Sequence, residues 1–359
     1  LPALLERCPP VGITIAFELS NSDELVLCGL ARWCRGLRFT AGYAGRAELV
    51  AAMSHAPETS GVRALLFESH DSEATARALN AIAGSPNWSG LRELTFTALG
   101  SGTDVSDALG RLLRAPHLRG LRRLHLGQAG NVLDLLPAIC GLPELRELLL
   151  ENGGLGDAGA EQLASAPALA TLRHLDLQHN QIGGRGASAL IASPHLKNLA
   201  VLDLDHNPVR NLDRAALAGA PAGGLRTIGF HGARLTVRDI TALTTSPRLS
   251  ELAYFDADNN GLAESALARL VQGFGDHPPA ILYLASNNIR EAGVAALTSW
   301  PAAANIDMLH LIGNTLPTAS AKAIAACPHL QQLTHLCAGT AHPAGRKALK
   351  ACFGDRAFV

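Results

Sequence analysis

The segment Leu172–Ile182, with the sequence LRHLDLQHNQI, decides the fold. Leu175 and Leu177 flank Asp176, an alternation that predicts a short strand with one buried face. Asn180 follows where the chain must turn out of the strand, and a side-chain amide there can pair with the backbone of neighbouring turns. The same phrase returns at 199–209, 252–262 and 306–316, as LAVLDLDHNPV, LAYFDADNNGL and IDMLHLIGNTL.

A regular period accompanies the phrase. Its first position falls at Val62, Leu91, Leu121, Leu145, Leu172, Leu199, Leu225, Leu252, Pro279, Ile306 and Leu333, so that successive phrases are 24 to 30 residues apart. A proline stands five residues before most of these positions, and proline cannot continue a helix. We therefore predict that each period holds one strand and one helix, and that the helix ends before the proline.

The phrase and its period resemble the leucine-rich repeat family of the ribonuclease-inhibitor type. The S-P-H-L and L-D-L-x-x-N phrases also resemble those of bacterial cytosolic leucine-rich repeat proteins. The resemblance implies an α/β solenoid, a horseshoe with a parallel β-sheet on its concave face and helices on its convex face. We expect an N-terminal capping region at 1–61, an array of about eleven repeats at 62–342, and a capping helix at 343–359.

The N-terminal region is the least regular part of the chain. Alternating apolar residues predict strands at 11–19 and 37–39, and helices are expected at 23–34 and 47–54. We interpret these elements as degenerate repeats that cover the open end of the core, because a terminal repeat otherwise exposes an apolar face.

The amino-acid composition limits the classes of partner and the cellular compartments that we expect for this chain. A net charge of −1 and a pI near 7.0 argue against nucleic acid or an anionic membrane as the main partner. Seven irregularly spaced cysteines without C-x-x-C predict reduced thiols in the cytoplasm and no zinc site. Nucleotide-binding, hydrolase and zinc-protease motifs are missing, so we expect no cofactor. The sequence begins at Leu1 without methionine, and we expect a monomer or one part of a larger chain.

Two sets of charged residues are predicted to point into the concavity. Arginines occupy the second phrase position of several repeats and form an edge that includes Arg146 and Arg173. They either solvate the edge, paired with Glu93 and Glu147, or clamp an acidic partner surface. The centre of the face carries an acidic strip with interleaved histidines, and its carboxylates are Asp176, Asp203, Asp205, Asp256 and Asp258.

The acidic strip permits three interpretations. It is a protein-binding surface, it only confers solubility, or it forms a metal or acid–base site. An open, wet face lacks the geometric closure on which metal selectivity depends, and we therefore predict no tightly bound metal there.

A cluster of apolar residues falls at outward positions of three adjacent predicted strands, and it consists of Tyr254, Ile281, Tyr283, Met308 and Ile312. The inward positions of those strands already carry leucine and phenylalanine. A contiguous apolar patch on an outward face predicts a protein-binding hot spot, with Tyr283 at its centre. The alternative is packing against a long loop or an N-terminal extension.

These observations predict a non-enzymatic protein-recognition module that binds a protein partner on its concave face. One alternative is a regulator of a partner enzyme, as the similar leucine-rich repeat GTPase-activating proteins are. Another is a metal-dependent enzyme that uses the central aspartates and histidines. Turnover of a bound partner would separate the first two, and the third requires a bound metal.

Overall fold

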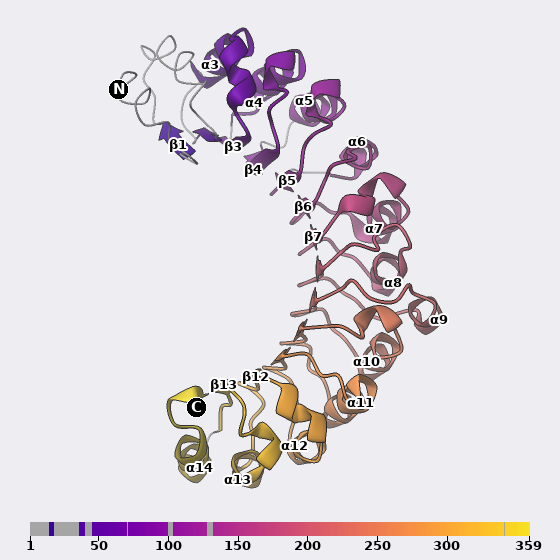
Figure 1. The fold of residues 1–359 in the computed structure, drawn as a ribbon, viewed down its shortest axis with the longest axis vertical. Coiled ribbons are helices and arrows are strands. Elements are labelled where there is room, and N and C mark those ends of the chain that lie inside the picture. The colour runs from indigo at the N-terminus through magenta and orange to yellow at the C-terminus, as the bar shows by residue number, and fades with distance from the viewer. Residues whose placement is uncertain are drawn as a thin grey trace. The chain divides into compact units, whose positions relative to one another are not determined.

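A computed structural model of the chain describes residues 14–17, 36–39, 45–69, 71–99, 103–127, 132–340 and 342–359. The chain divides into two compact units. Unit 1 comprises 1–155 and 166–175, and unit 2 comprises 156–165 and 176–359. Within each unit the strands are parallel and follow one another in chain order, and the helices lie on one side of the strands (Figure 1). This arrangement confirms the predicted α/β class, a solenoid of repeated strand and helix.

Unit 1 alternates strands and helices as the period predicts. Its strands are β1 (Thr14–Phe17), β2 (Gly36–Phe39), β3 (Ala64–Ser69), β4 (Glu93–Leu99), β5 (Arg123–Leu126) and β6 (Glu147–Leu149). Its α-helices are α3 (Gly45–Ser54), α4 (Ser72–Ala83), α5 (Thr103–Leu113) and α6 (Leu136–Ile139). Strand β7 (His174–Asp176) contains the boundary between the units: His174 and Leu175 belong to unit 1, and Asp176 belongs to unit 2.

Unit 2 continues the same alternation. Its strands are β8 (Val201–Asp203), β9 (Thr227–Gly229), β10 (Tyr254–Asp256), β11 (Ile281–Tyr283), β12 (Met308–His310), β13 (His335–Cys337) and β14 (Ala357–Phe358). Its α-helices are α7 (Gly156–Ala164), α8 (Gly184–Ala192), α9 (Arg214–Ala218), α10 (Val237–Leu243), α11 (Glu264–Phe274), α12 (Glu291–Thr298), α13 (Thr318–Ala326) and α14 (Pro343–Phe353).

The prolines lie after the helices, as predicted, and most of them open a short 3-10 turn. In unit 2 these turns are η6 (Pro247–Leu249), η7 (Pro301–Asn305) and η8 (Pro328–Leu330). In unit 1 they are η1 (Pro57–Gly61), η2 (Pro86–Trp88), η3 (Pro116–Leu118) and η5 (Pro167–Thr171). Proline lacks the N–H group that a continuing α-helix would need, but it fits the first position of a new turn.

The core of each unit lies between the strands and the helices. Inward strand positions supply it with leucine, isoleucine and phenylalanine side chains that are at most 1% exposed, among them Leu65, Leu94, Leu124 and Leu148 in unit 1 and Leu202, Ile228, Phe255, Leu282, Leu309 and Leu336 in unit 2. Because strand side chains alternate between faces, the residues beside these leucines must point away from the core.

Asparagines join successive repeats where the strands end. Asn207 Oδ1 accepts hydrogen bonds from the N–H groups of Asn180 (2.9 Å) and Ile182 (3.0 Å). Asn207 Nδ2 donates to Leu177 O at 2.8 Å. A single buried amide thus satisfies several backbone groups that have no partner within their own turn.

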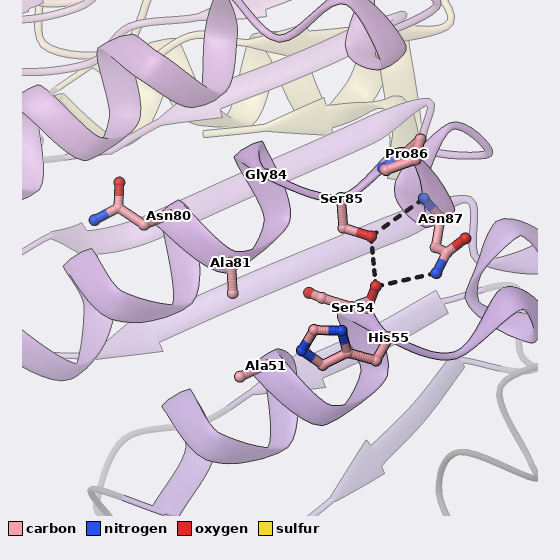
Figure 2. Close-up of a pocket in the computed structure, with 9 residues that line it drawn as sticks. All are labelled: Ala51, Ser54, His55, Asn80, Ala81, Gly84, Ser85, Pro86 and Asn87. Carbon is pink, nitrogen blue, oxygen red and sulfur yellow. Dashed lines mark hydrogen bonds between the residues drawn. The ribbon is translucent and has the colours of Figure 1, made fainter.

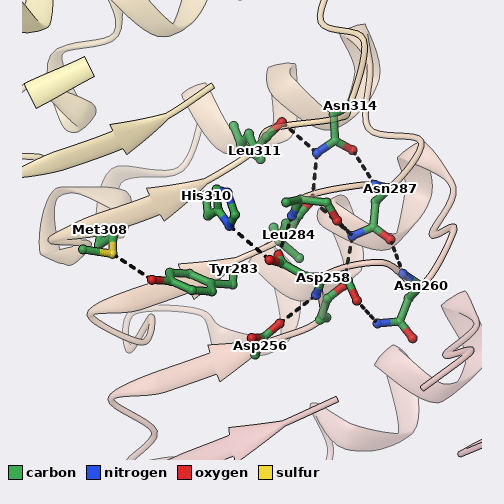
Figure 3. A network of polar contacts seen from close by, with 12 residues as sticks. Asp256, Asp258, Asn260, Tyr283, Leu284, Asn287, Met308, His310, Leu311 and Asn314 are labelled. Atoms are coloured by element: carbon green, nitrogen blue, oxygen red, sulfur yellow. Dashed lines mark hydrogen bonds and ion pairs between the residues drawn. The ribbon is translucent and has the colours of Figure 1, made fainter. Parts of the chain in front are cut away.

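The same pattern recurs further along unit 2. The N–H of Asn260 donates to Asn287 Oδ1, and the N–H of Asn287 donates to Asn314 Oδ1, both at 3.1 Å (Figure 3). The asparagines thus form a ladder of hydrogen bonds, in two runs. It is interrupted because Ala233 occupies the corresponding position of the intervening repeat and has no amide.

The two ends of the chain differ in how far the predictions can be followed. Strands β1 and β2 and helix α3 occur where strands and a helix were expected, whereas the helix expected at 23–34 lies outside the described residues. At the C-terminal end, α14 is followed by β14, a strand not foreseen from the sequence, which pairs in parallel with β13. Among the described helices, none combines the length and apolar character that crossing a membrane requires.

Candidate partner-binding face

Parallel pairing arranges the outward side chains of β8 to β13 in two rows. The first row consists of Val201, Thr227, Tyr254, Ile281, Met308 and His335. The second row consists of Asp203, Gly229, Asp256, Tyr283, His310 and Cys337. We call these two rows the strand face. Since the helices cover the opposite side of the sheet, the strand face is the side on which a partner can meet the strands (Figure 1).

Four of the five predicted apolar residues lie together on the strand face. Ile281 stands between Tyr254 and Met308 in the first row. The ring of Tyr283, in the second row, lies 5.3 Å from the ring of Tyr254. The Tyr283 hydroxyl donates to Met308 Sδ at 3.2 Å (Figure 3). We call these four residues the aromatic cluster. The contacts bring together three strands that are about 27 residues apart in the chain.

The aromatic cluster is half-buried rather than fully exposed, which differs from the sequence prediction. Its rings cover one another, and Tyr283 also meets the His310 ring edge-on at 5.0 Å. Among the described residues, Phe358 is the large apolar side chain that is exposed to solvent. Ile312, the fifth predicted residue, follows β12, where its carbonyl accepts from Ser286 N–H at 2.7 Å.

Three of the five predicted aspartates stabilise the turn that follows their own strand. Each accepts a hydrogen bond from the backbone N–H two residues later: Asp176 from Gln178 (3.1 Å), Asp203 from Asp205 (2.9 Å) and Asp256 from Asp258 (2.8 Å). A short carboxylate is well suited to this local bond. The acidic strip is therefore partly structural.

The other two aspartates reach the following repeat. Asp205 Oδ1 accepts from the N–H of His231 at 2.7 Å, and Asp258 Oδ1 accepts from the N–H of Ala285 at 2.5 Å. The second oxygen of Asp258 lies 3.0 Å from His310 Nδ1 (Figure 3). Each of these carboxylates thus links two turns, which fixes the strand face in one arrangement.

Crowding and burial keep several of these carboxylates from ionising easily. Burial, together with the negative charge of neighbouring carboxylates, raises the pKa of Asp203 to about 7 and the pKa of Asp205 to about 6. Burial also raises the pKa of Asp258, although His310 acts in the opposite direction. Ionising these carboxylates at neutral pH therefore costs free energy, because the charged form is desolvated on the strand face.

Histidines border the acidic strip. The rings of His179 and His206 stack with centroids 4.3 Å apart, and His206 meets His231 at 4.9 Å. Partial burial and the two neighbouring imidazoles lower the pKa of His206. In the described part of the chain, the group that could hold a metal ion consists of His231, Asp256 and Asp258, with one ligand atom from each within 4.8 Å of the others. All three residues belong to the strip of aspartates and interleaved histidines that the sequence indicated.

The arginine edge belongs to unit 1 at Arg146 and Arg173. Both residues are exposed, and the carbonyl of Arg146 accepts from the N–H of Arg173 at 2.8 Å. Glu147, which the sequence suggested as a partner for the edge, pairs instead with Arg123 at 3.4 Å. Because strand side chains alternate, Glu147 points to the same side as the residue paired with it in register on β5.

A hollow of about 440 Å³ lies in unit 1 beside the ends of α3 and α4 (Figure 2). The carbonyl of Ser54 accepts there from Ser85 Oγ (2.5 Å) and Asn87 Nδ2 (3.0 Å). Trp88 Nε1 donates to Ser54 Oγ at 2.9 Å. These polar groups satisfy one another and hold two repeats together, so we assign the hollow a structural role.

Comparisons with known proteins agree with the fold. The family model described as "Leucine Rich repeat" matches residues 168–190. The chain has a leucine-rich repeat fold. Its repeats therefore account for the parallel strands and for the asparagine ladder, while a search of curated protein sequences finds no match.

Solved structures with TM-scores above 0.5 share the fold at low sequence identity. A TLR13–ssRNA13 complex matches at 16% identity and a TM-score of 0.52, covering 92% of this chain and 41% of that one. A chain of the yeast Rad7 and Elc1 complex matches at 14% identity and a TM-score of 0.51, covering 92% of this chain and 78% of that one. An internalin (inlF) from Listeria monocytogenes matches at 17% identity and a TM-score of 0.49, covering 84% and 82%.

The sequence prediction omits one residue of the strand face that the structure makes prominent. Gly229 stands in the second row between Asp203 and Asp256. The sequence does contain a sign of this residue. In the repeat LRTIGFHGARL (225–235), glycine stands at the fifth position, where three other repeats carry aspartate.

Proposed function

We propose that this leucine-rich repeat protein is a non-enzymatic recognition module whose strand face in unit 2 binds a protein partner. The observation that carries the proposal is the aromatic cluster, in which Tyr254, Ile281, Tyr283 and Met308 adjoin on a face that the described helices of unit 2 leave open. Tyrosine combines a large apolar ring with a polar hydroxyl, and it is enriched in the residues that dominate binding energy at interfaces.

The rigidity of the strand face supports the proposal. The asparagine and aspartate side chains hold the backbone on either side of each strand. A partner would therefore meet a surface that is already ordered and would lose less conformational entropy on binding. Catalysis would require an enclosed pocket with converging reactive groups, and the strand face is an open surface.

Kinetics of partner binding test the proposal. A partner captured from the source cell should bind the Tyr283→Ala variant about 30-fold more weakly, mainly through faster dissociation, because a hot-spot truncation costs about 2 kcal/mol. The control is Lys347→Ala, which truncates an exposed side chain on helix α14, outside the strand face. Equal losses in both variants, or none in Tyr283→Ala, would show that the cluster is packing and not a binding site.

We also propose that Arg146 and Arg173 steer an acidic part of the partner. Both side chains are exposed, and exposed charges act mainly on association. Arg173→Ala should lower the association rate and its salt dependence more than it changes dissociation. If the partner is an enzyme, measuring its turnover with and without the chain shows whether the module also regulates it.

A cytoplasmic location and the ribonuclease-inhibitor type of repeat remain part of the proposal. Support for the location comes from the described cysteines Cys140, Cys327, Cys337 and Cys352, which are free thiols. Free thiols are usual where the surroundings are reducing. Fractionation of the source cell followed by antibody detection of the native chain tests the location.

A further inference from the structure

Gly229 lies in the middle of a group of carboxylates on the strand face. In the second row it stands between Asp203 and Asp256. A Cβ atom added to Gly229 would lie 2.7 Å from Asp205 Oδ1 and 3.1 Å from Asp203 Oδ1. The two carboxylates therefore lean over the glycine backbone. We call Asp203, Asp205, Asp256 and Asp258 the acidic corner.

The acidic corner lacks a lysine or arginine of its own. The two rows of the strand face contain neither residue type. The ion pair recorded for the corner in the described structure joins Asp258 to His310. Four carboxylates crowd together with no lysine or arginine in either row, and burial together with this crowding raises the pKa of Asp203 and Asp205. A cation brought from outside would relieve this repulsion.

The acidic corner and the aromatic cluster form one continuous surface. Tyr254 Oη donates to Asp256 Oδ2 at 3.0 Å, and Tyr254 and Asp256 occupy the same strand. The next strand contributes Tyr283, whose ring lies 5.3 Å from that of Tyr254. A ligand that bound both parts would need a cationic group and an apolar group a few ångströms apart, which is a common arrangement in a peptide chain.

Resting on the proposed function, we infer that the partner presents a basic segment, with an arginine or lysine side chain over Gly229 and an apolar side chain against the aromatic cluster. Arginine suits the position best, because its planar guanidinium can pair with carboxylates and stack on a tyrosine ring. The charge complementarity of the acidic corner selects this occupant over an acidic or neutral segment.

The hydrogen bonds of the corner favour a side-chain cation over a metal ion. In the group His231, Asp256 and Asp258, both oxygens of each carboxylate already accept hydrogen bonds. Asp256 accepts from Asp258 N–H and from Tyr254 Oη, and Asp258 accepts from Ala285 N–H and interacts with His310. A metal ion would have to displace some of these donors, whereas a guanidinium can add to the existing network.

A random peptide library displayed on phage tests the inference, with the full chain immobilised and EDTA in the buffer. Selected peptides should combine arginine or lysine with a neighbouring apolar residue. A synthetic copy of one such peptide should bind Asp203→Asn and Asp205→Asn each about tenfold or more weakly than the wild type. Asparagine retains the oxygen that accepts the backbone N–H group, so both variants should keep the fold, which far-ultraviolet circular dichroism checks.

Asp355→Asn is the matched control, because it removes the same charge from an exposed residue outside the strand face. Selected peptides without basic residues, or unchanged binding by both Asp203→Asn and Asp205→Asn, would overturn the inference. If such peptides still need Tyr283, the proposed function stands. If peptide binding is indifferent to Tyr283→Ala as well, the proposed function fails with it. Binding that appears only when manganese replaces EDTA would assign the corner to a metal ion and refute the basic segment.

Discussion

Replacing Asn287 by alanine should remove the central amide of the longer run of the asparagine ladder. Asn287 is 4% exposed, and its Oδ1 accepts from the N–H groups of Asn260 (3.1 Å) and Leu262 (3.0 Å). Its Nδ2 donates to the carbonyls of Ala257 (2.9 Å) and Leu284 (3.1 Å). The alanine variant would leave the buried N–H group of Leu262 and the part-buried N–H group of Asn260 without an acceptor.

The lost hydrogen bonds set the expected decrease in the free energy of unfolding. An orphaned buried donor costs about 1–3 kcal/mol, so two of them, with the weakened carbonyls, should lower the free energy of unfolding by about 3 kcal/mol or more. Urea unfolding followed by circular dichroism measures it. The control is Asn288→Ala at the exposed neighbouring residue, which should change the free energy by less than about 0.5 kcal/mol. A loss below about 1 kcal/mol for Asn287→Ala would refute the structural role assigned to the ladder.

Three further predictions concern protonation, a buried cation and the thiols. Because folding raises the pKa of Asp203 to about 7 and that of Asp205 to about 6, these groups stabilise the fold most below the ordinary carboxyl pKa, and their contribution should disappear as the pH rises to about 7. Urea unfolding between pH 4.5 and 8 should show a shallower decline for Asp203→Asn, and identical slopes would contradict the assignment. Arg248 is 1% exposed, burial lowers its pKa, and it donates to two backbone carbonyls more than 50 residues earlier. Arg248→Ala should therefore cost about 3 kcal/mol of unfolding free energy, and Arg248→Lys should restore little of it, because lysine lacks the planar fork. Burial raises the pKa of Cys140 to about 11 and raises that of Cys337, so both should react slowly with a thiol reagent at pH 7 until the chain unfolds. Rapid modification of the native protein would argue against their burial.

The sequence alone determined the repeat and the position of each residue within it. Leucines at Leu175 and Leu177, an amide at Asn180 and a proline such as Pro194 recur with one period, and each acts over a few residues. Strand alternation, turn formation and helix termination are local effects, so a single chain segment suffices to predict them. For the same reason, the sequence could predict which residues face outward.

Only the tertiary structure decided which outward residues meet. The diagonal contact of Tyr283 with Tyr254, and the placement of Gly229 among carboxylates, depend on the register of neighbouring strands and on side-chain rotamers. Aspartates that the sequence presented as a possible binding strip were found to satisfy the backbone of the following turns. Arg248 reaches a carbonyl two repeats away, a distance over which no local pattern carries information. Such contacts arise because packing brings distant repeats together, and the repeat period specifies where residues stand but not which partner each side chain selects.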